Sequence, residues 1–145
     1  MSFQLDYDQL ILLDAEDLAE GGIRTAYLEL VPALEGYVTS PAVVDETNDT
    51  SIGRYVVRCG DFEFVIYEPG MEENSWGRAT FAFFKIVNDQ MMGSEYRFYA
   101  INGGNDLGGM FLKPADVEAA RLALPRKNDW PYIPTPDPPE YGWPG

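Results

Sequence analysis

At 145 residues, the chain is long enough to bury a substantial core, and we expect a single domain. Its formal net charge is −14 and 46% of its residues are hydrophobic, which excludes global disorder. So acidic a surface repels the phosphates of nucleic acids and anionic membranes, and we expect neither as a partner. The first residues lack a signal-peptide pattern and no apolar run is long enough to span a bilayer, which predicts a soluble cytoplasmic protein.

The negative charge is concentrated in the first half of the chain. Residues 1–73 contain 16 Asp or Glu and 3 Arg, whereas residues 74–145 contain 8 acids and 7 bases. This asymmetry predicts a surface that either steers a basic partner inward or keeps the protein in solution. The chain has no His, which removes Ser-His-Asp and Cys-His catalysis and the commonest metal ligand. Cys59 is the single cysteine, so we expect an inert thiol, no intrachain disulfide and no cysteine metal cluster.

The first predicted elements are a short apolar segment and a long interrupted helix. Residues 9–13 are apolar, and we expect them to be buried as a short helix or strand. Asp14 suits the N-cap of a helix whose apolar residues recur at a helical period as far as residue 37. Gly21-Gly22 interrupts this pattern, so two helices meeting there are an alternative. Pro32 should kink the helix or mark a fresh start.

The middle of the chain predicts strands between acidic loops. Residues 42–46 favour a strand, and residues 45–51 favour a polar loop. Residues 55–59 and 62–67 are the clearest strands, and the Gly60-Asp61 turn between them is typical of a hairpin. A second acidic loop follows at residues 68–74.

The second half predicts a helix, a central hairpin and a further helix. Ser75 begins a helix with an apolar stripe that continues to Met91. Residues 96–101 alternate as a strand, and the Gly- and Asn-rich residues 102–106 predict a turn that leads into a return strand at 108–112. Pro114 then begins a helix that Pro125 ends.

These elements predict an α+β fold: an antiparallel sheet of about four to six strands with helices packed on one face. We expect the domain to span residues 1–133 and a proline-rich tail to span residues 134–145. Residues 130–133 are expected to pack on the domain, and the tail is expected to be looser. Proline-rich segments with aromatics can also be ligands for groove-binding modules, so the tail has a second interpretation.

The glycine-rich tip of the central hairpin has several possible roles. A phosphate cradle requires a glycine-rich turn that leads into a helix with a nearby base, whereas this turn leads into a strand and carries Asp106. Asn102, Asn105 and Asp106 offer oxygen ligands for calcium, but the EF-hand spacing and closing glutamate are absent. A structural turn or a rigid polar recognition loop fits the residues better.

Six carboxylates flank the predicted hairpin of residues 55–67. If both acidic loops leave the same end of the sheet, they form one acidic rim. A solvated face, a surface that docks a protein, and a catalytic pair of the glycosidase type are the alternatives for this rim. A catalytic pair requires a cleft that raises a pKa, which favours the first two. The six are Asp45, Glu46, Asp49, Glu68, Glu72 and Glu73.

Three features together carry a resemblance to a known kind of protein. They are the acidic helix start, the sequence Ser75-Trp-Gly-Arg78, and the strand and turn of residues 96–106. In combination they resemble the small acidic immunity proteins that bacteria encode beside polymorphic or secretion-system toxins. The resemblance implies a cytoplasmic stoichiometric inhibitor that binds a basic toxin domain and blocks its active site. In such a pair, charge complementarity speeds association and aromatic anchors supply much of the affinity.

We therefore predict a non-catalytic binding protein, without a cofactor or metal, whose partner is a cognate toxin domain of basic charge. An alternative is a small-ligand-binding protein or enzyme with its site at residues 102–106. A third is an interaction module that uses the proline-rich tail. The predicted partner-binding residues are Asp45, Glu46, Asp49, Glu72, Glu73, Asn102, Asn105 and Asp106.

Overall fold

The computed structural model describes residues 5–71 and 73–144. These residues form six strands in two three-stranded antiparallel sheets, which confirms the α+β class and the predicted number of strands. The strands are divided between two small sheets instead of one larger one. The first, called here the outer sheet, has the order β2 (Val44–Asp49), β3 (Arg54–Cys59), β4 (Phe62–Tyr67). The second, the inner sheet, has the order β1 (Ile11–Leu12), β6 (Gly108–Leu112), β5 (Arg97–Ile101).

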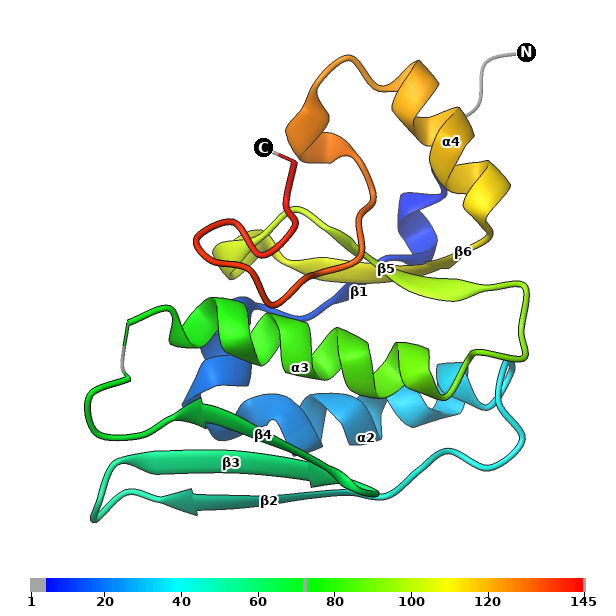
Figure 1. The fold of residues 1–145 in the computed structure, drawn as a ribbon. Helices are drawn as coiled ribbons and strands as arrows, with labels where there is room; N and C mark the ends of the chain where they lie inside the picture. The colour runs from blue at the N-terminus through cyan, green and yellow to red at the C-terminus, as the bar shows by residue number, and fades with distance from the viewer. Residues whose placement is uncertain (1–4, 72, 145) are drawn as a thin grey trace.

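The two long helices lie between the sheets (Figure 1). The core there combines apolar residues of α2 (Ile23–Leu34) and α3 (Ser75–Asp89) with one face of each sheet. A smaller core on the opposite face of the inner sheet joins Met110 and Leu112 to Val117 of α4 (Pro114–Ala123). Helices therefore cover one face of the outer sheet and both faces of the inner sheet.

The helical segment in the first half begins and breaks where its sequence predicts. Asp14 is the N-cap of α1 (Ala15–Asp17), because its Oδ1 accepts the Glu16 N–H at 3.0 Å. In the next turn, η2 (Leu18–Gly22), the backbone leaves helical angles at Glu20 and Gly21, and Gly21 has a φ of 99°. Two helical pieces thus meet at the glycine pair, as the alternative interpretation predicted. The helix does not restart at Pro32, which lies in the last turn of α2.

Two expectations for the first half are wrong. Residues 45–51 are not mainly a loop, because β2 pairs residue by residue with β3 from Val44 to Asp49. An edge strand pairs on one side only and can carry charged side chains, so its polar composition resembles that of a loop. Residues 9–13 are not uniformly buried: Leu13 is buried, whereas the side chain of Leu12 in β1 is 79% exposed.

The second half follows its predicted elements, and a buried asparagine joins two of them. Asn88, near the end of α3, accepts the Phe98 N–H at 2.7 Å and donates to the Phe98 C=O at 2.9 Å. Its side-chain amide thus pairs with β5 as a neighbouring strand would. The remaining short helical turns are η1 (Tyr7–Gln9), η3 (Gly104–Asp106) and η4 (Lys127–Asp129).

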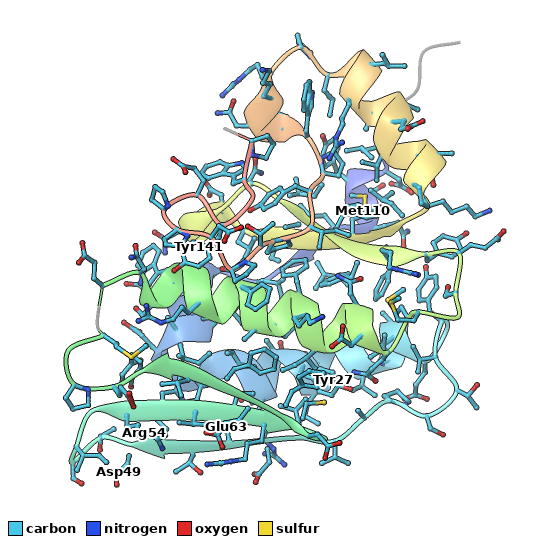
Figure 2. All side chains as sticks on the ribbon, in the orientation of Figure 1. Tyr27, Asp49, Arg54, Glu63, Met110 and Tyr141 are labelled. Carbon is cyan, nitrogen blue, oxygen red and sulfur yellow. The ribbon has the colours of Figure 1, made fainter. Side chains whose placement is uncertain are left out.

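The C-terminal segment packs against the domain as far as residue 144. Tyr132 forms a two-bond antiparallel bridge with Ala100 of β5, in line with the packing expected for residues 130–133. Further along, Tyr141 is only 7% exposed and lies against α3 at Gly77, so the segment is less loose than its composition predicted (Figure 2). A Cβ atom at Gly77 would lie 2.1 Å from the Tyr141 ring, so glycine makes this approach possible.

Candidate functional site

The residues predicted for the site fall into two groups in the structure. Asp45, Glu46 and Asp49 lie on β2, and Glu73 is exposed in the turn before α3. Asn102, Asn105 and Asp106 lie at the tip of the β5–β6 hairpin. Glu72 lies outside the described residues.

Glu46 connects the outer sheet to the start of α2 through its hydrogen bonds. Its Oε2 accepts the Tyr55 hydroxyl at 2.5 Å and the Arg24 N–H at 3.3 Å, and the Tyr55 hydroxyl oxygen accepts the Ile23 N–H at 3.1 Å. A carboxylate beside the first N–H groups of α2 is favourable, because the N-terminus of a helix carries partial positive charge. Burial, and next the hydrogen bond to Glu46, raise the pKa of Tyr55 far above its usual value. Glu46 is therefore a helix cap, half-buried, and is poorly placed to bind a partner.

The exposed acids of β2 do not form a single rim. Asp49 orders the β2–β3 turn, since its Oδ1 accepts the Ser51 hydroxyl at 2.6 Å and the Ser51 N–H at 3.0 Å, and these bonds lower the pKa of Asp49. Asp45 pairs in register with Arg58 near the other end of the strand. Four residues of extended chain place Asp45 and Asp49 about 13 Å apart. Figure 2 shows Asp49 at the extreme end of the outer sheet.

The hairpin tip docks onto the start of α1. The Asn105 amide donates to Asp14 Oδ1 at 3.0 Å and to Glu16 Oε1 at 3.3 Å, and the Leu107 C=O accepts the Leu13 N–H at 2.9 Å. Asn102 has a φ of 60°, and its C=O accepts the Tyr132 hydroxyl at 2.7 Å. The tip is thus a rigid structure, and Asp106 remains exposed on it.

Three open depressions in the surface meet at β1. The largest, of about 890 Å³, lies between β1 and the end of α2 and is bordered by Ile11, Ala33 and Tyr37. A second, of about 480 Å³, lies between β1 and the start of α2, and a third, of about 540 Å³, lies between β1 and the hairpin tip. The three share residues of the segment from Leu10 to Leu13, so they adjoin one another along it, and we call them together the groove.

Carboxylates border each of the three depressions. Within the part of the chain that the structure describes, no Lys or Arg borders the three depressions. Glu95 forms a long ion pair with Lys113, at 3.9 Å, and the other six acids form none with any described residue. We call these seven carboxylates the acidic face: Asp8, Asp14, Asp17, Glu20, Glu29, Glu95 and Asp106.

The acidic face adjoins the edge of the outer sheet at Gly21-Gly22. Gly21 borders the second depression, and a Cβ there would lie 2.5 Å from Nδ2 of Asn48 on β2. Asn48 in turn accepts the Tyr67 hydroxyl at 3.3 Å. The two groups of predicted residues thus flank the same helix junction, with Asp106 on one side and β2 on the other.

Of the predicted residues that the structure describes, only Asn102, Asn105 and Asp106 border the groove. The other acids around the groove were not predicted from the sequence, where Asp14 suited only the N-cap of a helix. The concentration of charge in residues 1–73 was the available signal, but it does not say which acids share a surface.

The arrangement offers little for metal or thiol chemistry among the described residues. No three of their Asp, Glu or Cys side chains form a group that could hold a metal ion. Burial, and secondarily Asp89, raise the pKa of the Cys59 thiol, which disfavours the reactive thiolate. No helix among residues 5–71 and 73–144 has the length and apolar character to cross a membrane.

The fold and this surface define a small acidic α+β domain whose most prominent concave feature is a groove lined by carboxylates. Comparisons with protein-family models, with curated proteins and with solved structures find no match for the chain.

Proposed function

We propose that the chain is a non-catalytic binding protein that captures a basic protein partner on its acidic face. The observation that carries this proposal is the lining of the groove, with seven carboxylates and no Lys or Arg among the described residues. Together with the resemblance noted in the sequence, it supports an immunity protein that neutralises a cognate toxin domain by stoichiometric binding in the cytoplasm.

The charge distribution gives such a protein a defined kinetic advantage. Unpaired carboxylates around a concave surface concentrate the negative potential there and attract a partner of opposite charge before contact. This steering can raise association rates by about 10- to 1,000-fold at low ionic strength, and salt weakens it. Four of the bases, Arg54, Arg58, Lys85 and Arg126, form ion pairs away from the groove, and Lys113 forms the long pair with Glu95 at its border.

Exposed and half-buried apolar groups beside the acids provide candidate anchors. Leu12 is 79% exposed at the groove, and Tyr37 stacks on Phe111 with ring centroids 4.4 Å apart where both border the largest depression. Affinity in protein complexes is usually concentrated in a few apolar and aromatic groups, whereas peripheral charges act mainly on the rate of association.

A small-ligand site at residues 102–106 is the second candidate, because Asn102, Asn105 and Asp106 border one depression. The Asn105 amide is already used by Asp14 and Glu16, so a ligand there meets mainly carboxylate oxygens. Such a site would favour a small cation over an anion. A ligand that raises Tm in the wild type and has no effect on Asn105→Ala or Asp106→Ala would support this candidate.

Capture of partners from the native cells tests the first proposal. The tagged protein is incubated with the cell extract, and separately with the product of the adjacent upstream gene, at low and high salt. We expect one stoichiometric partner with a basic domain, released as salt increases. Absence of a protein partner at both salt concentrations would remove the support for a binding protein and direct attention to the ligand candidate.

A further inference from the structure

Three of the four outer edges of the two sheets are covered or charged. Along β5, the Ala100 N–H donates to the Tyr132 C=O at 2.7 Å, and the Tyr132 N–H donates back at 3.0 Å. Along β4, Arg78 Nε donates to the Ile66 C=O at 2.7 Å. Along β2, every side chain after Val44 is acidic or polar, a composition that discourages pairing with another strand.

The fourth edge, β1, has none of these protections. Its residues, Ile11 and Leu12, are apolar and pair with Gly109 and Gly108 of β6. The Leu13 N–H donates to the Leu107 C=O, so by the alternation of an antiparallel ladder the N–H and C=O of Leu12 point away from β6. No other described residue forms a hydrogen bond with these two groups. They are available to another strand.

The groove beside this edge has room for an extended chain. Its opposite wall is one face of α2 and the turn after it, where the residues are mostly small: Thr25, Ala26, Ala33 and Gly36, with Glu29 among them. The ten helical residues from Thr25 to Leu34 extend about 15 Å. An extended segment of about five residues covers that length.

The negative charge around the edge of β1 favours a basic segment as its binding partner. Asp17, Glu20 and Glu29 border the second depression, and Asp8 and Glu95 border the largest. A second copy of this chain would bring the same carboxylates together, whereas lysine or arginine side chains would neutralise them. In an extended segment alternate side chains point to opposite sides, so apolar residues can face the groove while basic residues reach the acids.

We propose that the partner adds an extended basic segment to β1, as a fourth strand of the inner sheet. This inference rests on the proposed function, since it specifies how the basic partner is held. Main-chain hydrogen bonds to Leu12 supply the register, and the acidic face supplies the preference for lysine and arginine.

The test uses the full chain and a short blocked peptide that alternates lysine and valine. Hydrogen exchange of the Leu12 amide is followed by NMR with and without the peptide. We expect saturating peptide to slow this exchange by about tenfold or more, because the Leu12 N–H becomes a hydrogen-bond donor. Leu12→Pro removes that donor, and an edge strand tolerates proline where the N–H faces solvent. This variant should bind the peptide about tenfold more weakly, whereas Leu12→Ala keeps the amide and should retain most of the binding.

A peptide with N-methyl groups at alternate residues provides a control that leaves the protein unchanged. It keeps the charge and loses the donors for the Leu12 C=O, so we expect it not to bind. Equal binding of the methylated peptide, unchanged exchange at Leu12, or no binding of the parent peptide would each overturn strand addition. So would self-association of the chain through this edge in sedimentation. The capture experiment tests whether a protein partner binds and how salt affects that binding, whereas the peptide experiment tests how it binds. A failure of strand addition can therefore be distinguished from a failure of the proposed function.

Discussion

The Tyr55 hydroxyl donates to the Glu46 carboxylate across 2.5 Å and, through the same oxygen, accepts the Ile23 N–H that begins α2. One side chain from β2 and one from β3 thus fix the outer sheet against the start of a helix. Gly21, where the chain turns between the two helical pieces, lies directly beside this junction. The position of the groove depends on this junction, because α2 forms one of its walls.

Removing the carboxylate of Glu46 should destabilise the fold. Glu46→Ala removes the acceptor of the Arg24 N–H and of the Tyr55 hydroxyl at the N-terminus of α2, and it should lower the free energy of unfolding by about 1–2 kcal/mol. Chemical denaturation measures the change. Asp45→Ala on the same strand is the matched control, because Asp45 is exposed, and it should change stability by less than about 0.5 kcal/mol. An equal loss in both variants would show that Glu46 is not a cap.

The buried tyrosines should make the fold sensitive to alkali. Burial raises the pKa of Tyr55, and that of Tyr132, above the usual value of 10.0. Below pH 10 the two tyrosine hydroxyls keep their protons in both the folded and the unfolded chain. Above pH 10 the unfolded chain loses protons that the folded chain retains, so the free energy of unfolding falls as the pH rises. One such group contributes a slope of about −1.4 kcal/mol per pH unit. Chemical denaturation between pH 8 and pH 11 should show that the free energy of unfolding falls less steeply with pH in Tyr55→Phe than in the wild type. An unchanged slope would contradict a raised pKa for Tyr55.

The contact between Gly77 and Tyr141 should hold the C-terminal segment in place. Gly77→Ala puts a methyl group where the ring lies, and Tyr141→Ala removes the buried ring, at a cost of about 2–4 kcal/mol. Since both changes disrupt one contact, the double variant should lose less than the sum of the two. Gly93→Ala is the control, because a Cβ there meets nothing within 4 Å. Limited proteolysis should detect the released segment, and full additivity would argue against this contact.

The amide of Asn88 should be essential for docking α3 on β5. Asn88→Ala leaves the buried N–H and C=O of Phe98 unpaired, which should cost about 2–4 kcal/mol. Thermal and chemical denaturation report the loss. Asp89→Asn changes the next residue, which forms only a partly exposed ion pair with Lys85, and should cost less than about 1 kcal/mol. A small effect of Asn88→Ala would mean that water replaces the amide.

Neutralising the acidic face should slow capture of a basic partner. The triple variant Asp17→Asn, Glu20→Gln, Glu29→Gln removes three charges and should reduce the association rate constant about tenfold or more at low salt, with a weaker salt dependence. The control Asp45→Asn, Asp61→Asn, Glu73→Gln removes the same charge elsewhere and should have a much smaller effect. Surface plasmon resonance with the captured partner measures both. If the control variant slowed association more than the variant of the acidic face, the partner-binding site would lie on the outer sheet instead.

Local features of the sequence determined the secondary structure and the fold class. The alternation in β5, the β-branched and aromatic residues of β3 and β4, the glycine turns and the N-cap at Asp14 act between residues close in the chain, so they can be read from it. The polar residues of β2 were misassigned because an edge strand and a loop have similar composition.

Only the tertiary structure decided where the groove lies and which acids share it. Asn105 and Asp14 are 91 positions apart in the chain, yet their hydrogen bond brings the hairpin tip to the first helix. In sequence, Leu12 and Leu13 are indistinguishable; in the fold one is 79% exposed at a free edge and the other is buried. Exposure and edge position depend on which distant segments pair and pack, and no local pattern encodes that pairing.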